Sequence, residues 1–187
     1  GTAGLRARPG RLAAVRQSAP RRCRMDADER RSVRRIEAAD AWAVRHEVMW
    51  PERPPEYSRV DGDEDPSLSQ HYGLFVDDVL VSVCSLFLEG DSAQFRKFAT
   101  RVQRQGQGHG THLLHHVFDA AKLAGCASIC CNARIEQAPY YRKFGLAETP
   151  GSAFEKGGRH FVVMAADLQP AQAALSAEPS VPADTRA

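Results

Sequence analysis

The chain has 187 residues, which is enough for one domain with a sizeable hydrophobic core. Hydrophobic residues make up 43% of it and charged residues 26%, as in ordinary globular proteins. The formal net charge of +2 gives no strong attraction to nucleic acid or to a membrane surface. No apolar run approaches the ~20 residues that span a bilayer. We therefore expect a soluble protein that has neither nucleic acid nor membrane as a partner.

Both ends of the chain lack the periodic apolar pattern of folded elements. Residues 1–31 are rich in Arg and Ala, a composition typical of a mitochondrial transit peptide. Non-native sequence, or sequence upstream of a start at Met25, explains it equally. Residues 169–187 are rich in Pro and Ala and cannot bury enough apolar surface to offset the entropy of ordering them. We predict an extension over 1–31, a folded domain over 32–168 and a disordered tail over 169–187, in the cytoplasm unless residues 1–25 target the mitochondrion.

The elements expected in the folded domain follow from its apolar periodicity and its turn residues. Strands are predicted over residues 32–36, 72–76, 80–88, 94–100, 127–133 and 160–165. Helices are predicted over residues 41–49, 110–124 and 136–144, the first of them capped by Asp40. The proline-rich, charged residues 51–70 form a long loop. This order predicts an α/β fold, with a mixed sheet that has helices on both faces.

Three glycines alternate in RQGQGHG (104–110), between a predicted strand and a predicted helix. Glycine lets the backbone approach a ligand closely, and a helix start offers unpaired N–H groups and a positive dipole end. This combination favours an anion site, most naturally for a pyrophosphate. The P-loop is excluded because no Lys follows the glycines, and the GxGxG spacing differs from the dinucleotide-binding GxGxxG. A flexible turn without a ligand is the alternative.

The histidines after this loop raise the question of a metal site. His112, His115 and His116 fall on one arc of the predicted helix, opposite its apolar arc, so they should face solvent. His112 and His116 have the i, i+4 spacing that chelates an added metal, but exposed pairs usually lack groups that orient the rings. We expect no native metal site, and a histidine-based metal protein is kept as a hypothesis to be excluded.

Two motifs in a fixed order carry a family resemblance. QGQGHG (105–110) lies between a strand ending in FRKFAT and a helix beginning with THLL, and APYYRKFGL (138–146) follows about thirty residues later. A weaker third motif is GGRHFVVM (157–164). Together they resemble the GNAT superfamily of acyl-CoA-dependent N-acyltransferases, in its small bacterial-type members, over about residues 32–168. The resemblance implies a mixed, mostly antiparallel, splayed sheet flanked by helices on both faces, with acetyl-CoA as co-substrate and no metal.

The resemblance also implies where the cofactor binds. Backbone N–H groups of residues 105–110 would hold the pyrophosphate of CoA, and the strand edge at residues 98–100 would pair with the pantetheine amides. The sheet would open between strands 94–100 and 127–133 to admit the thioester. The implied cofactor-binding residues are Phe98, Ala99, Thr100, Gln105, Gly106, Gln107, Gly108, His109, Gly110, Thr111, Asn132 and Tyr141.

For the chemistry, the resemblance implies direct attack of an amine on the acetyl carbonyl, with a backbone N–H stabilising the oxyanion. Tyr141 is the expected general acid, because a phenol keeps its proton at pH 7 and can give it to the leaving thiolate. Its neighbour Tyr140 is expected to be a packing residue. Candidates for the base are His160, Glu155, Glu56 and a water chain, and the sequence does not choose among them.

The acceptor is expected to be a primary amine, on a small molecule or on a peptide lysine. In this family residues 45–72 would line the acceptor side, and Arg45, His46, Trp50, Tyr57 and His71 are among them. The acids of this segment could attract a cationic amine or could simply be solvated; they are Glu52, Glu56, Asp61, Asp63, Glu64 and Asp65. The sequence is compatible with a homodimer. A non-catalytic acyl-CoA-binding module of the same fold is the alternative function.

Overall fold

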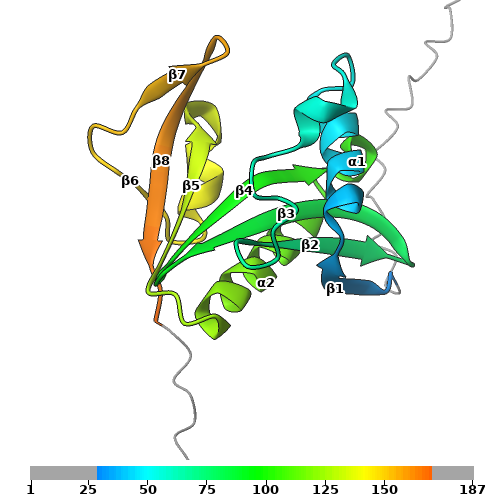
Figure 1. Cartoon of the computed structure of the whole chain (residues 1–187), viewed down its shortest axis with the longest axis horizontal. Helices are drawn as coiled ribbons and strands as arrows, with labels where there is room; N and C mark the ends of the chain where they lie inside the picture. The colour runs from blue at the N-terminus through cyan, green and yellow to red at the C-terminus, as the bar shows by residue number, and fades with distance from the viewer. Residues whose placement is uncertain (1–28, 170–187) are drawn as a thin grey trace, which may run out of the picture.

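The computed structural model describes residues 29–169, and Figure 1 shows their arrangement. Within this range one sheet holds β1 (Arg31–Ile36), β2 (Ser69–Val76), β3 (Val79–Glu89), β4 (Ser92–Thr100), β5 (Ser128–Arg134), β6 (Ala147–Glu148), β7 (Phe154–Lys156) and β8 (Arg159–Asp167). The helices are α1 (Ala38–Met49), α2 (His109–Leu123) and α3 (Ala138–Arg142). Single 3₁₀ turns span Pro55–Ser58, Val102–Arg104 and Ile135–Gln137. The predicted extension and tail fall almost wholly on residues 1–28 and 170–187, outside the described part.

The sheet order is β1-β2-β3-β4-β5-β8-β6, with β7 paired to β8. Every neighbouring pair is antiparallel except β4 with β5, which is parallel. The mixed, mostly antiparallel sheet predicted from the sequence is therefore confirmed.

The parallel pair is where the sheet opens. β4 and β5 are in register over three residue pairs only: Ser92 with Ser128, Ala93 with Ile129, and Gln94 with Cys130. Beyond Gln94 the two strands diverge, as the two arms of the sheet in Figure 1 show. The predicted opening between these strands is confirmed, and it leaves one edge of β4 without a strand partner from residue 95 onwards.

On its other side, β4 contains a bulge against β3. Val83 is opposite Ala99 and Ser85 is opposite Arg96, so β4 carries one more residue than β3 between these pairs. Lys97 lies in the bulge with φ +53°, a left-handed backbone conformation that is uncommon for a residue other than glycine. The bulge therefore places a lysine in a fixed orientation just beyond the point where the sheet opens.

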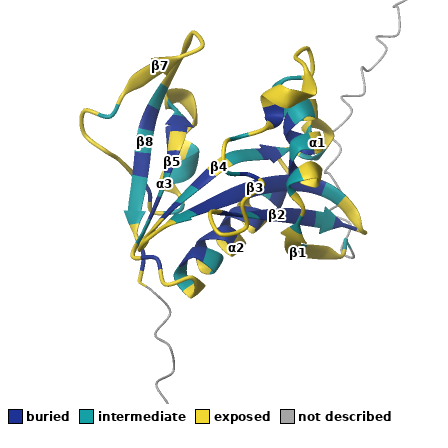
Figure 2. Ribbon diagram, in the orientation of Figure 1, coloured by how far each residue is buried: buried dark blue, intermediate teal, exposed yellow. Residues whose placement is uncertain are grey.

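Two buried clusters hold a helix on each face of the sheet. The larger contains Leu113, Leu114 and Val117 of α2, packed on β2, β3 and β4. The smaller contains Ala41 and Val44 of α1, packed on β3 and β4. Figure 2 shows the buried residues running along the central strands between the two layers. Helices on both faces were predicted, and the packing confirms them.

Local details differ from the sequence-based expectations. α1 begins at Ala38 after Glu37, so Asp40 lies in its first turn and does not cap it. The helix predicted over 136–144 is a 3₁₀ turn followed by the five-residue α3. β6 and β7 were not predicted, because two or three residues carry no periodic pattern. The Gly157-Gly158 pair, with φ +59° and +69°, was nevertheless a signal for the two-residue hairpin turn between β7 and β8.

Candidate functional site: a glycine loop beside the opened sheet

The glycine loop presents a row of free backbone donors. Gly106 and Gly108 have φ +73° and +81°, and Gly108 is the N-cap of α2 without a side-chain capping bond. The first helical bond is donated by the N–H of His112 to the carbonyl of Gly108. Within the described part of the chain, the N–H groups of residues 106–111 donate to no other residue. This row, at the positive end of a fifteen-residue helix, has the geometry of a phosphate-binding site.

Two predicted cofactor residues, Gln105 and Thr100, are placed differently from the expectation. The N–H of Gln105 donates to the carbonyl of Val102 (3.2 Å), so it is not free for a phosphate. The side chain of Gln105 donates to the carbonyl of Thr100 (2.9 Å) and occupies that acceptor on the β4 edge. The ring of His109 is buried, with Nε2 3.2 Å from Oε1 of Gln107. His109 can therefore contribute only its backbone N–H to a ligand.

Gly110 is required by packing, not by backbone conformation. A Cβ at this position would lie 2.8 Å from Cζ of Phe98 and 3.2 Å from Oγ1 of Thr100. The absence of a side chain thus lets the first turn of α2 lie directly against the free edge of β4. The third glycine of the motif brings the phosphate loop and the opened strand together.

We expect Gly110→Ala to weaken CoA binding by about tenfold, because Phe98 or the start of α2 has to move to make room for the methyl group. Isothermal titration with CoA measures the change. Gly125→Ala is the matched control: φ is +84° and a Cβ there meets nothing within 4 Å, so it strains the end of α2 without touching the loop. Equal CoA affinity of Gly110→Ala and wild type would contradict the placement of the site.

Aromatic side chains connect the glycine loop to α3. The ring of Tyr140 stacks on that of Phe98, with centroids 6.3 Å apart and planes 11° apart. The Tyr140 hydroxyl lies 3.4 Å from Oγ1 of Thr111 in the first turn of α2. Tyr140 is therefore a packing residue that joins three elements, in agreement with its expected role.

Tyr141 lies deeper, at the opening between the two arms of the sheet. Its ring packs against Phe95 of β4 at a centroid distance of 5.7 Å. Burial raises the pKa of its phenol well above the usual value, and the nearby thiols of Cys131 on β5 and Cys84 on β3 raise it further. The phenol therefore stays protonated at neutral pH. A neutral hydroxyl at the opening fits the donor role proposed for it.

Two further candidates have exposed side chains. Asn132 is exposed on β5, on the face opposite the buried Cys131. His160 is exposed at the start of β8 and is paired with Glu155 of β7 in the hairpin. Neither side chain makes a hydrogen bond to another described site residue. A base is therefore not assigned by geometry.

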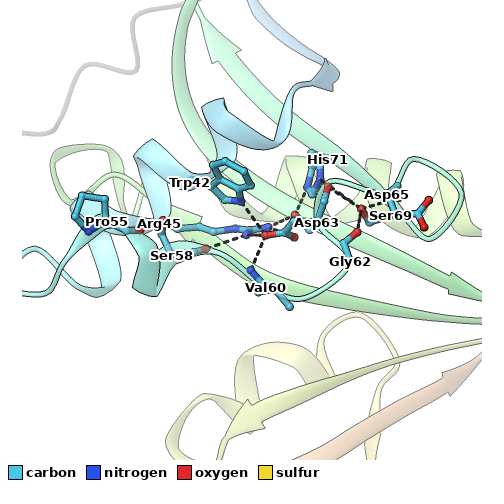
Figure 3. Close-up of polar contacts among 11 residues, drawn as sticks. Trp42, Arg45, Pro55, Ser58, Val60, Gly62, Asp63, Asp65, Ser69 and His71 are labelled. Atoms are coloured by element: carbon cyan, nitrogen blue, oxygen red, sulfur yellow. Dashed lines mark hydrogen bonds and ion pairs between the residues drawn. The ribbon is translucent and has the colours of Figure 1, made fainter.

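The acceptor side contains a buried polar network that sequence reasoning had placed on the surface (Figure 3). Arg45 of α1 is fully buried and makes two bonds to the Asp63 carboxylate, at 2.6 and 3.3 Å. Arg45 also donates to Oγ of Ser85 on β3. Trp42 donates its indole N–H to the same carboxylate at 2.8 Å. Arg45 thus holds the loop to the sheet and does not line a substrate site, which corrects the expectation.

His71 completes the network and is likewise buried, so it does not line the acceptor side either. Its Nε2 lies 2.8 Å from the carbonyl of Asp63 and must donate, because that oxygen can only accept. Its Nδ1 then accepts from Ser85 at 2.5 Å. Burial alone would raise the pKa of Asp63, but the hydrogen bond and charge of Arg45, together with the hydrogen bonds from Trp42 and Val60, hold the pKa below its usual value.

The histidines on the outward face of α2 are exposed to solvent, as the sequence predicts. His112, His115 and His116 are exposed. The ring of His115 packs against Phe144 (5.1 Å between centroids) and that of His116 against Tyr72 (5.3 Å). Among residues 29–169, no group of three or more His, Cys, Asp or Glu side chains is arranged to hold a metal ion. In the same range, no helix has the length and apolar character needed to cross a membrane.

One residue of interest was not predicted from the sequence at all. Lys97, in the β4 bulge, is partly buried and its Nζ lies 4.4 Å from the centroid of the Trp50 ring. Burial lowers its pKa first, and the positive charges of Arg45 and Lys156 lower it further. The sequence FRKFAT gives no sign of the position of Lys97, because the bulge depends on the register of β4 with β3.

A sheet opened between two parallel strands, with a glycine loop and a helix start at the opening, is the arrangement of the acyl-CoA N-acyltransferase fold. Residues 58–168 match the family model of the acetyltransferase (GNAT) domain, so the chain belongs to the GNAT acetyltransferase family. It is 29% identical over 133 residues to the uncharacterized N-acetyltransferase YitI of Bacillus subtilis (strain 168), covering 67% of this chain and 88% of that protein.

Solved structures share the fold at low sequence identity. The ribosomal-protein-S18-alanine N-acetyltransferase of Escherichia coli superposes with a TM-score of 0.63 at 16% identity, over 79% of this chain and 99% of that one. The PaiA N-acetyltransferase of Thermoplasma acidophilum, in complex with coenzyme A, gives a TM-score of 0.57 at 13% identity, over 74% and 99%. These likenesses show the same fold over 79% and 74% of the chain.

Proposed function

We propose that this protein is an N-acetyltransferase that moves the acetyl group of acetyl-CoA to a primary amine, by direct attack within a ternary complex. The domain responsible is residues 32–168. The observation that carries the proposal is the row of free N–H groups at residues 106–111, directly beside the opened edge of β4. Acetyl-CoA would supply the activated thioester, and the residues of this chain would bind and orient it.

Each part of the opening has a role in this proposal. The N–H groups of residues 106–111 bind the pyrophosphate. The unpaired edge of β4 near residues 98–100 offers backbone groups to the pantetheine amides, as a strand edge does to a peptide. Tyr141 protonates the departing thiolate. The acceptor amine approaches from the α1 face, opposite the glycine loop, and loses its proton to a base that the geometry does not identify.

Acetyl-CoA at about one hundred times its Kd should stabilise the folded protein by roughly 2.7 kcal/mol and raise its Tm by several degrees. Differential scanning fluorimetry with acetyl-CoA, and with adenosine as a control that lacks the pyrophosphate, measures this shift. No shift at saturating acetyl-CoA would overturn the binding site. Release of free thiol across a panel of amines then tests transfer, and a shift without release would identify the non-catalytic acyl-CoA-binding module instead.

A further inference from the structure

The β4 bulge fixes Lys97 at the point where the two arms of the sheet separate. The last residue of β4 in register with β5 is Gln94, three positions earlier. A left-handed conformation is strained for a residue with a long side chain, and the pairing around the bulge has to offset that strain. The conformation directs the lysine to the α1 face, where its Nζ lies over the ring of Trp50.

Lys97 has a positive charge in a partly buried position and no negative partner. Among the described residues, no carboxylate forms an ion pair with it. The negative charge of Asp63 favours the protonated form of Lys97. Asp63 is nevertheless already bound to Arg45 in a buried ion pair. Removing a cation from water without pairing it is unfavourable, so an anion brought to this position would be stabilised.

Other positive groups surround the same position. Arg96 is the preceding residue, and its guanidinium lies over the ring of Phe87, 4.4 Å from the centroid. Lys156 is on β7, in the opposite arm of the sheet (Figure 1), and its charge also acts on Lys97. The floor of the opening is thus basic on its α1 face, whereas the acids of residues 51–70 other than the paired Asp63 are exposed.

The anion concerned is not a phosphate of CoA. Lys97 contacts Trp50 on the α1 face of β4, whereas the next residue, Phe98, turns to the other face and packs against Gly110 and Tyr140 of the glycine-loop side. Lys97 and the phosphate-binding row therefore lie on opposite faces of the strand. In the proposed function, the group that reaches Lys97 from the α1 face is the acceptor.

We propose that Lys97 binds a carboxylate carried by the acceptor, so that the acceptors are amino acids or other small amines bearing a carboxylate. The inference rests on the proposed function and narrows it. A polyamine or a peptide lysine, which brings only positive charge, would be repelled by Lys97, Arg96 and Lys156.

The test compares free amino acids with their carboxamides as acceptors, in an assay of thiol release. The carboxamide removes the negative charge at almost unchanged shape. It also makes the amine less basic, so chemistry that ignores the carboxylate would favour the carboxamide. The wild type should prefer the acids. Lys97→Met should raise KM for the preferred acid about tenfold or more with little change in kcat, and leave the carboxamide unaffected. Lys97→Arg should restore part of the difference.

Lys122→Met is the matched control, because this lysine lies on the exposed face of α2 in a surface pair with Asp119. It should keep the wild-type preference, and melting curves establish that each variant is folded. Equal or better use of carboxamides by the wild type would overturn the inference and leave the proposed function intact. An equal loss of kcat for acid and carboxamide in Lys97→Met would also overturn it, since Lys97 would then act on the amine. No thiol release with any amine would reject the proposed function itself.

Discussion

Tyr141→Phe should lower kcat by on the order of 10²–10⁴-fold, the usual contribution of a positioned general acid. The substitution removes one oxygen and keeps the ring packed against Phe95. Thiolate leaving from the opening would then have to take its proton from water. The measurement is the steady-state rate of thiol release at saturating acetyl-CoA. The thermal shift produced by acetyl-CoA should stay at the wild-type value, because the phosphate-binding row is untouched.

Tyr140→Phe is the control, since it removes a neighbouring hydroxyl that contacts only Thr111 and preserves the stack on Phe98. Its kcat should stay within a few-fold of wild type. The pH dependence adds a second criterion. A general acid is active at pH values below its pKa. Burial raises the pKa of the Tyr141 phenol above its ordinary value near 10. The titration of Tyr141 should therefore cause no loss of kcat between pH 7 and 9. Similar losses in both variants would contradict the assignment of Tyr141.

Most of the fold could be predicted because its long elements carry their pattern locally. β3 and α2 have eleven and fifteen residues, and the apolar spacing of each is visible in the sequence. β6 and β7 could not be found in that way, since β7 is held by pairing with β8 and by the Phe154–Phe161 stack.

The candidate site, like the fold, could be predicted from the sequence only in part. The glycine loop could be predicted because residue type indicates two of its features, the positive φ angles of its glycines and its position before a helix. Lys97 could not be predicted, because its conformation depends on one extra residue in β4 relative to β3. Arg45 and His71 were placed on the acceptor side because the family resemblance assigns residues 45–72 to that side. Only the structure shows that a loop acid, Asp63, closes over them.

That buried network decides how firmly the acceptor side is held. Asp63 ties the loop between α1 and β2 to α1 through Arg45 and Trp42, and it accepts the N–H of Val60 within the loop. Arg45 connects this group to the sheet by donating to Ser85 of β3. Arg45 in turn donates to the carbonyl of Ser58 at 3.1 Å. Both members of the ion pair are almost wholly removed from solvent, with 0% and 4% of their surfaces exposed. Loss of either one leaves a buried charge without its partner.

Arg45→Met should therefore lower the free energy of unfolding by about 3–5 kcal/mol, the usual cost of breaking a buried ion pair from one side. Chemical denaturation monitored by tryptophan fluorescence measures it, with Trp42 inside the network as a reporter. Arg101→Met is the control, because its pair with Glu47 is partly exposed and should contribute no more than about 1 kcal/mol. The double variant Arg45→Met, Asp63→Leu should recover part of the loss, since it leaves no isolated charge. A double variant less stable than the single one would show that the network does more than pair charges.

The same pair predicts how stability depends on pH. The pKa of Asp63 is lower in the folded protein than in the unfolded chain, so the folded state binds fewer protons in this range. Its contribution is complete above the unfolded value of about 4 and is lost as the pH falls through the lower folded-state pKa. Wild-type stability should thus decline below about pH 4 more steeply than that of the double variant, which has no carboxylate at position 63. Parallel declines would mean that other acids govern the acid unfolding of this protein and that the Asp63 charge is not specifically stabilised by Arg45.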